Sequence, residues 1–127
     1  MKKYGAFRHN LLPRSPLRFD RLEDINGDLI VEISDGADYR LSIRFDGYIF
    51  YSKQDEGDAL RTLEEINNFN LLGTPVIRAQ DSSLLNWLST ETFAIRKVDE
   101  MIHFIILTDN DVINVLCFDE PLITRHH

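Results

Sequence analysis

The sequence contains one cysteine among its 127 residues, which excludes a disulfide within the chain. No apolar run approaches the roughly 20 residues that a membrane-spanning helix needs. The basic start, Met1-Lys2-Lys3, does not lead into the apolar segment of a secretory signal, because Arg8 and His9 interrupt it. These absences predict a protein of a reducing compartment, and we expect it in the cytoplasm.

Motifs for catalysis and for cofactor binding are also missing. The chain has no Gly-rich phosphate loop and no Gly-x-Ser-x-Gly nucleophile turn. His126 and His127 have no cysteine or carboxylate beside them and form a poor metal site. The string 24–28 superficially suggests a calcium loop, but its glycine follows the second ligand, whereas an EF-hand requires it after the third. We therefore expect no metal or cofactor, and we interpret 20–28 as an acidic loop that turns into a strand.

Positive charge is scarce. The chain has 14 Lys and Arg against 21 Asp and Glu, a net charge of −7. This balance disfavours nucleic acid and anionic membranes as partners, and it permits a basic protein partner.

The apolar fraction of 43% is typical of a folded protein, and the length predicts one domain over residues 1–127.

The scarce cations are concentrated in residues 1–18, which contain no acidic residue. The five cations are Lys2, Lys3, Arg8, Arg14 and Arg18. Because Pro13 and Pro16 interrupt regular structure, we interpret this segment as a partly extended arm. We expect it to lie over the acidic body, held by Tyr4, Phe7, Leu11, Leu12 and Leu17; a nucleic-acid-binding tail is the alternative.

Residues 28–53 predict a three-stranded meander with strands at 28–33, 39–45 and 48–53. Apolar and polar residues alternate through 39–45, as in a half-buried strand. Asp46-Gly47 is typical of a two-residue type I′ hairpin turn, which would pair Phe45 with Tyr48. A three-residue loop at 34–36 would align Leu29 with Leu41.

Two helices are expected after this meander, at about 58–70 and 82–90. Apolar residues recur at helical spacing in both segments. Acidic residues 55–58 suit the start of the first helix, and Asp81 or Ser82 suits the cap of the second. Trp87 is a candidate for a partly exposed aromatic residue, and the alternative is burial in the core, because it shares a helix face with Leu84 and Leu88. Between the helices, 75–79 predicts a short strand, possibly at a sheet edge.

Residues 93–118 predict a second meander, with strands at 93–98, 101–108 and 112–118. Two-residue turns at 99–100 and 109–110 would pair Ile95 with Phe104, and Phe104 with Val115. One face is then apolar except for Lys97 at its edge, and it forms the core. It carries Phe93, Ile95, Ile102, Phe104, Ile106, Ile113, Val115 and Cys117, the last as a small hydrophobic residue. The opposite face mixes apolar side chains with His103 and Asn114, so we expect another element to cover it in part.

These elements together predict an α+β fold. Its mostly antiparallel sheet would be built from the two meanders, at about 28–53 and 93–118, with the two intervening helices packed on it. We expect the meanders to join into one sheet, because two separate layers would leave more strand edges to protect.

Candidate protein-binding residues come from the acidic loops and from the outward face of the first meander. They are Arg40, Arg44, Tyr51, Asp55, Glu56, Asp58, Asp109 and Asp111. Mixed aromatic and arginine surfaces are common at interfaces, and acidic loops can attract a cationic surface. The structural alternatives are a helix cap at 55–58 and charge that only keeps the protein soluble.

A different candidate is a small-molecule or enzymatic pocket between sheet and helices, formed by Arg96, His103 and Asn114. The composition, however, is similar to that of small inhibitor and immunity proteins, which are often acidic, poor in cysteine and without catalytic motifs. We therefore expect a non-catalytic protein-binding module with a basic partner. Apolar area left on both meanders also predicts a homo-oligomer.

Overall fold

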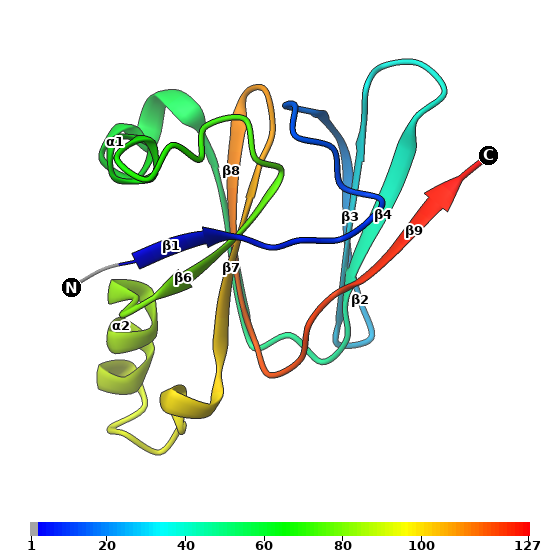
Figure 1. The fold of residues 1–127 in the computed structure, drawn as a ribbon. Coiled ribbons are helices and arrows are strands. Elements are labelled where there is room, and N and C mark those ends of the chain that lie inside the picture. The colour runs from blue at the N-terminus through cyan, green and yellow to red at the C-terminus, as the bar shows by residue number, and fades with distance from the viewer. Residues whose placement is uncertain (1–2) are drawn as a thin grey trace.

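The structure is a computed structural model that describes residues 3–127. It shows an α+β fold with two antiparallel sheets and two helices (Figure 1). The five-stranded sheet has the order β1-β6-β7-β8-β5, and the four-stranded sheet has the order β2-β3-β4-β9. The α+β prediction is confirmed, whereas the prediction of one joined sheet is wrong.

The five-stranded sheet contains β1 (Lys3–Ala6), β5 (Phe50–Asp55), β6 (Val76–Gln80), β7 (Ile102–Leu107) and β8 (Asp111–Cys117). The four-stranded sheet contains β2 (Arg18–Ile25), β3 (Asp28–Ser34), β4 (Arg40–Phe45) and β9 (Leu122–His126). The helices are α1 (Leu60–Asn67) and α2 (Ser83–Glu91), with short 3-10 helices η1 (Glu56–Asp58) and η2 (Val98–Glu100).

The elements form three layers, with the five-stranded sheet in the middle (Figure 1). The four-stranded sheet packs on one face through buried side chains such as Val31 and Ile43, which meet Phe104 and Val115. The helices cover the other face, where Ile66 of α1 packs in one apolar cluster and Leu88 of α2 in another. The second face of β7 and β8 is therefore covered, as its mixed polarity predicted.

The hairpin predicted at Asp46-Gly47 is wrong. The turn exists, and Gly47 has a φ of 63°, but the chain then crosses from the four-stranded sheet to the five-stranded sheet. β4 already has β3 and β9 as neighbours, so neither of its edges is open to β5. Instead, β5 pairs with β8, where Tyr51 lies opposite Val115.

The β3–β4 hairpin also differs from the prediction. Its loop is longer than the expected three residues, because the Asp35 carboxylate accepts hydrogen bonds from the backbone N–H groups of Ala37 (2.8 Å) and Tyr39 (3.2 Å). Leu29 therefore lies opposite Phe45 and not Leu41. The shift is four residues (45 minus 41), and because side chains alternate, the predicted buried face is unchanged.

Three strands were not predicted from the sequence. β2 occupies most of 18–28, which was interpreted as arm and acidic loop, and it turns into β3 through Asn26 and Gly27 with φ of 53° and 85°. β1 lies in the arm and makes β6 an internal strand, so the suggested edge position of β6 is wrong. β9 pairs with β4 near the end of the sequence.

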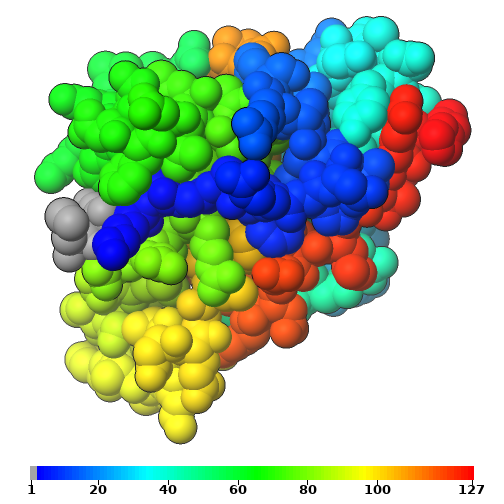
Figure 2. Space-filling model, viewed as in Figure 1, coloured from blue at the N-terminus to red at the C-terminus, as the bar shows by residue number. Residues whose placement is uncertain are grey.

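The arm lies across one face of the molecule, as the blue band in Figure 2 shows. Its β1 segment pairs with β6, and the Phe7 N–H donates to the Val76 carbonyl (2.9 Å). Leu17 is buried, and its carbonyl accepts a hydrogen bond from the Asp109 N–H (2.9 Å). The apolar residues expected to hold the arm all pack against buried clusters: Tyr4, Phe7, Leu11, Leu12 and Leu17.

The strand predicted at 93–98 is wrong. This segment follows the end of α2 as a turn that leads into η2, and both Phe93 and Ala94 have positive φ (51° and 62°). Phe93 is 91% exposed and Ile95 82% exposed, although both were expected in the core. Trp87, for which partial exposure and burial were both considered, is 43% exposed and packs on Phe50 with 5.1 Å between ring centroids.

The β7–β8 hairpin is confirmed in both register and face. Phe104 lies opposite Val115, and Ile102 lies opposite Cys117. The thiol of Cys117 is buried, which raises its pKa to about 12, with a further increase from Asp119. A thiol that stays protonated in this way behaves as the small hydrophobic residue that the sequence predicted.

Candidate functional site

The structure brings the two acidic loops together into one surface, which we call the acidic patch: Asp55, Glu56, Asp58, Asp109 and Asp111. The pairing of β5 with β8 places Asp55 directly opposite Asp111. The Glu56 N–H then donates to the carbonyl of Asn110 in the β7–β8 turn (2.8 Å). These contacts fix the two loops against each other.

Local hydrogen bonds and one lysine hold the acidic patch in place. The Asp55 carboxylate accepts from the Gly57 N–H (2.8 Å) and so caps η1, whereas α1 has no side-chain cap. The acidic run therefore caps the 3-10 turn that precedes the predicted helix. The ammonium group of Lys53 lies 3.0 Å from a carboxylate oxygen of Asp111. Asp55, Glu56, Asp58 and Asp109 remain exposed at the surface.

An apolar cavity of about 320 Å³ adjoins the acidic patch. Its lining includes the apolar side chains Pro16, Leu63, Leu72, Leu107 and Val112. Three members of the acidic patch also line it: Glu56, Asp109 and Asp111. The site is thus an apolar hollow with carboxylates at its margin, and it depends on the arm, α1 and the β7–β8 turn together.

The other predicted protein-binding residues lie elsewhere. Arg40 and Arg44 are on the outward face of β4, and Arg44 is engaged by Asp28 (3.1 Å) and Asp46 (2.5 Å). Both carboxylates raise the pKa of Arg44, with Asp46 the larger cause. Tyr51 is in the other sheet, half-buried against Tyr48 with 5.4 Å between ring centroids. The expected surface of Tyr51 with Arg40 and Arg44 does not exist.

Of the residues predicted for the alternative pocket, only His103 and Asn114 lie together. His103 and Asn114 lie on one face of β7 and β8, and His103 Nε2 is 2.8 Å from Asn114 Oδ1. Arg96 lies in the exposed turn after α2, so its predicted position opposite His103 is wrong. Sequence reasoning missed Ser82, whose hydroxyl is 2.5 Å from His103 Nδ1, and Ser52, which accepts from the Asn114 amide (3.3 Å).

These four residues form one chain of hydrogen bonds, in which the Ser82 hydroxyl also accepts from the Leu85 N–H (3.2 Å). Asn114 Oδ1 can only accept, so His103 Nε2 carries the proton and Nδ1 accepts from the Ser82 hydroxyl. His103 is 6% exposed, and burial lowers its pKa, so the ring is neutral near pH 7. Ser82 lines a cavity of about 360 Å³ between β6, α2 and η2.

Among residues 3–127, no group of three or more His, Cys, Asp and Glu side chains is arranged to hold a metal ion. No helix within the same residues is long and apolar enough to cross a membrane. Comparison with protein-family models, curated proteins and solved structures finds no match to this chain.

Proposed function

We propose that the protein is a non-catalytic binding module that engages a basic protein partner through the acidic patch. The observation that carries the proposal is the pairing of β5 with β8, which gathers five carboxylates from two separate loops beside an apolar cavity. Clustered charge of one sign steers an oppositely charged surface and accelerates its association.

The apolar cavity supports a basic partner more specifically than net charge does. Lysine and arginine side chains have an apolar stem and a charged end. The stem can pack against Leu63 and Leu72 while the charged end meets Glu56 or Asp109. Inhibitors and immunity proteins form interfaces of this kind when they cover a cationic surface of their target, and we infer that role here.

The test is capture of partners from the native cell with three forms of the protein at low and high salt. The first is unaltered, the second carries Glu56→Lys and Asp109→Lys, and the third carries Glu91→Lys and Glu100→Lys. The third form has the same net charge as the second, but its changes lie at exposed positions of α2 and η2, at the opposite end of β7.

A partner that uses the acidic patch is retained by the unaltered and third forms and is lost by the second. Its association rate should fall by about tenfold or more in the second form, because steering acts mainly on this rate. If the second and third forms retain the same proteins with the same rates, the proposal is wrong and the charge serves solubility.

A second candidate function is acyl transfer at Ser82. The favouring observation is the Ser82–His103–Asn114 chain, which has the order of nucleophile, base and orienting group. Ser82 Oγ would attack an ester carbonyl while its proton passes to His103 Nδ1 and then to the departing alcohol. Water would then cleave the acyl-serine.

This candidate is separated from the first by labelling with a fluorophosphonate, which reacts with activated serines. Modification of Ser82, lost in Ser82→Ala and kept in the neighbouring Ser83→Ala, would favour acyl transfer. No modification at all would leave His103 as a buried structural residue and Ser82 as the cap of α2.

A further inference from the structure

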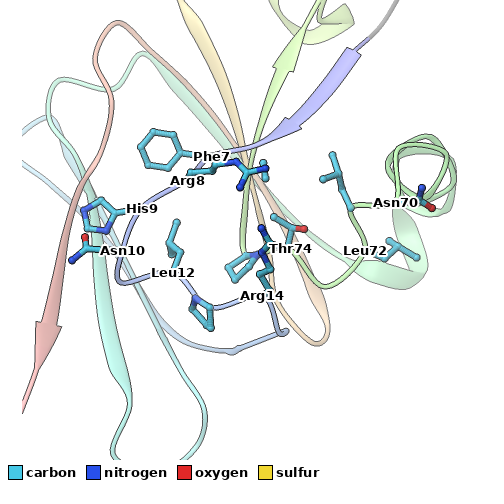
Figure 3. Close-up of a pocket in the computed structure, with 13 residues that line it drawn as sticks. Phe7, Arg8, His9, Asn10, Leu12, Arg14, Asn70, Leu72 and Thr74 are labelled. Atoms are coloured by element: carbon cyan, nitrogen blue, oxygen red, sulfur yellow. The ribbon is translucent and has the colours of Figure 1, made fainter.

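A cleft of about 630 Å³ lies between the arm and the loop that joins α1 to β6; we call it the arm cleft. One wall is formed by arm residues that include Phe7, His9 and Leu12, and the other by Asn70 and Leu72. Figure 3 shows Arg8, Arg14 and Thr74 between these two walls. The volume lies within the range of about 300 to 1,000 Å³ that is usual for small-molecule sites.

The charge of the arm cleft is opposite to that of the whole chain. Arg8 and Arg14 line it, and no Asp or Glu does, although the chain contains 21 acidic residues. Arg18, Arg21, Arg44 and Arg61 each form an ion pair with a carboxylate. Within residues 3–127, neither Arg8 nor Arg14 has such a pair, so both guanidinium groups are available to a ligand.

The wall that carries Arg8 is held firmly by the fold. The Phe7 ring packs edge-on against Phe104 with 5.4 Å between centroids, and the Phe7 N–H is bonded to Val76. On the other side of Arg8, the Leu11 N–H donates to His9 Nδ1 (3.1 Å) and the Leu12 N–H to the His9 carbonyl (3.0 Å). A backbone fixed on both sides lowers the entropy lost when a ligand is bound.

Hydrogen-bond donors and apolar walls complete the lining. Asn10 and Asn70 contribute amide groups and Thr74 a hydroxyl, while Phe7, Leu12 and Leu72 offer apolar surface. Because Nδ1 of His9 accepts a hydrogen bond, the proton of the neutral ring is on Nε2, which adds another donor. The lining therefore combines two cations, several neutral donors and apolar surface.

We propose that the arm cleft binds an organic phosphate monoester, whose phosphate contacts Arg8 and Arg14 and whose apolar body packs between Phe7, Leu12 and Leu72. Two guanidinium groups match the charge of about −1.5 to −2 that a phosphate monoester carries at pH 7. Each guanidinium can also donate two parallel hydrogen bonds to phosphate oxygens. Leu72 lines both this cleft and the apolar cavity beside the acidic patch, but no carboxylate of that patch lines the cleft, so the proposal does not depend on that patch binding a protein.

The experiment titrates the full chain with phenyl phosphate, inorganic phosphate and benzoate, and follows amide NMR shifts. Phenyl phosphate should bind most tightly, because it alone offers both a dianion and an aromatic body. Its shifts should centre on residues 6–14 and 70–75. Arg8→Gln with Arg14→Gln should weaken it at least tenfold, whereas Arg96→Gln with Lys97→Gln, two exposed cations outside the cleft, should leave the affinity unchanged.

Both arginines are exposed and form no ion pair within residues 3–127, so the double variant is expected to fold, which circular dichroism checks. The proposal is overturned if phenyl phosphate fails to bind at millimolar concentration, or if both double variants lose the same affinity. Equal binding of benzoate would also overturn it, since a monoanion would then suffice. Binding of a single-stranded oligonucleotide without binding of the monoester would assign the arm to nucleic acid instead.

Discussion

Asp55 on β5 lies directly opposite Asp111 on β8, so two carboxylates are cross-strand neighbours in the five-stranded sheet. Like charges in this position destabilise a sheet, and Lys53, 3.0 Å from Asp111, offsets the repulsion only in part. The remaining repulsion between Asp55 and Asp111 should therefore lower the stability of the fold.

We predict that Asp55→Asn increases the free energy of unfolding by ~0.5 kcal/mol at low salt, because it removes one of the facing charges. Asparagine can still accept the hydrogen bond from the Gly57 N–H, so the cap of η1 is kept. Urea unfolding at low salt and in 1 M NaCl measures the effect, which should disappear at high salt.

The control is Asp58→Asn, because Asp58 is exposed in η1 and lies opposite no carboxylate in the sheet. Its effect should be smaller than that of Asp55→Asn. An equal gain from both variants, or a gain unaffected by salt, would show that repulsion between Asp55 and Asp111 is not the cause.

His103 should make stability depend on pH. Burial lowers its folded-state pKa below the ordinary value of 6.5, so below that value the folded state binds fewer protons than the unfolded state. Its contribution is therefore complete above about pH 6.5 and is lost as the pH falls toward the folded-state pKa. The loss can reach about 1.4 kcal/mol for each pH unit.

The measurement compares the free energy of unfolding of the unaltered protein and of His103→Gln between pH 7.5 and pH 5. Carboxylates titrate in both proteins, so the difference between the two curves isolates His103. The unaltered protein should have the steeper decline. Parallel curves would mean that His103 can be protonated without loss of the fold.

The separation of β4 from β5 can be tested with engineered disulfides in a Cys117→Ala background. Ser42 on β4 and Thr124 on β9 are cross-strand partners, and such partners have Cα atoms about 4.5 to 5.5 Å apart. Cysteines at these positions should form a disulfide in air, since the distance lies in the usual range. Mass spectrometry under non-reducing conditions detects the bond.

The comparison is a pair of cysteines at Ser42 and Tyr51, which would face each other if β4 and β5 formed the hairpin that the Asp46-Gly47 turn predicts. These residues belong to different sheets, so no intramolecular bond should form. Efficient formation of this second bond would refute the two-sheet arrangement.

Two phenylalanines that were predicted to lie on the same core face should respond very differently to truncation. Phe104 is fully buried and touches Phe7 and Phe45, so Phe104→Ala should cost about 3 to 5 kcal/mol. Phe93 is 91% exposed, and Phe93→Ala should change stability by less than about 0.5 kcal/mol. Thermal and urea unfolding give both values. A large loss at Phe93 would place it in the core after all.

Local signals predicted the parts of the fold whose partners are close in sequence. The β7–β8 hairpin has a two-residue turn and an apolar residue at every second position on one face, so its register follows from counting outward from Asp109 and Asn110. The same alternation misled at 93–98, because Phe93 and Ile95 are spaced as in a strand but follow the last turn of α2. Two apolar residues at alternate positions therefore do not distinguish a strand from the turn that follows a helix.

Pairings between distant segments could not be read from the sequence. Nothing local to β4 indicates that β9 occupies its second edge, and this pairing is what sends β5 to the other sheet. β2 was missed because its outward side chains are charged, although Asn26-Gly27 is a strong hairpin signal.

The candidate sites were likewise predictable only where their residues belong to segments close in the sequence. Each acidic loop was recognised separately, but their union required the position of β5 beside β8. His103 and Asn114 were correctly placed on one face, because that depended only on the β7–β8 register. Ser82 was missed as their partner because the approach of α2 to β7 is a contact between segments far apart in the sequence.

The pairing of β4 with β9 also has a consequence for how the protein is made. β4 has an unpaired edge until Leu122–His126 has been synthesised, far downstream. The same is true of β5, which must wait for β8. Long-range pairing of this kind slows folding and leaves strand edges open to other chains. During translation, the nascent chain is therefore expected to need protection by chaperones until β8 and β9 emerge from the ribosome.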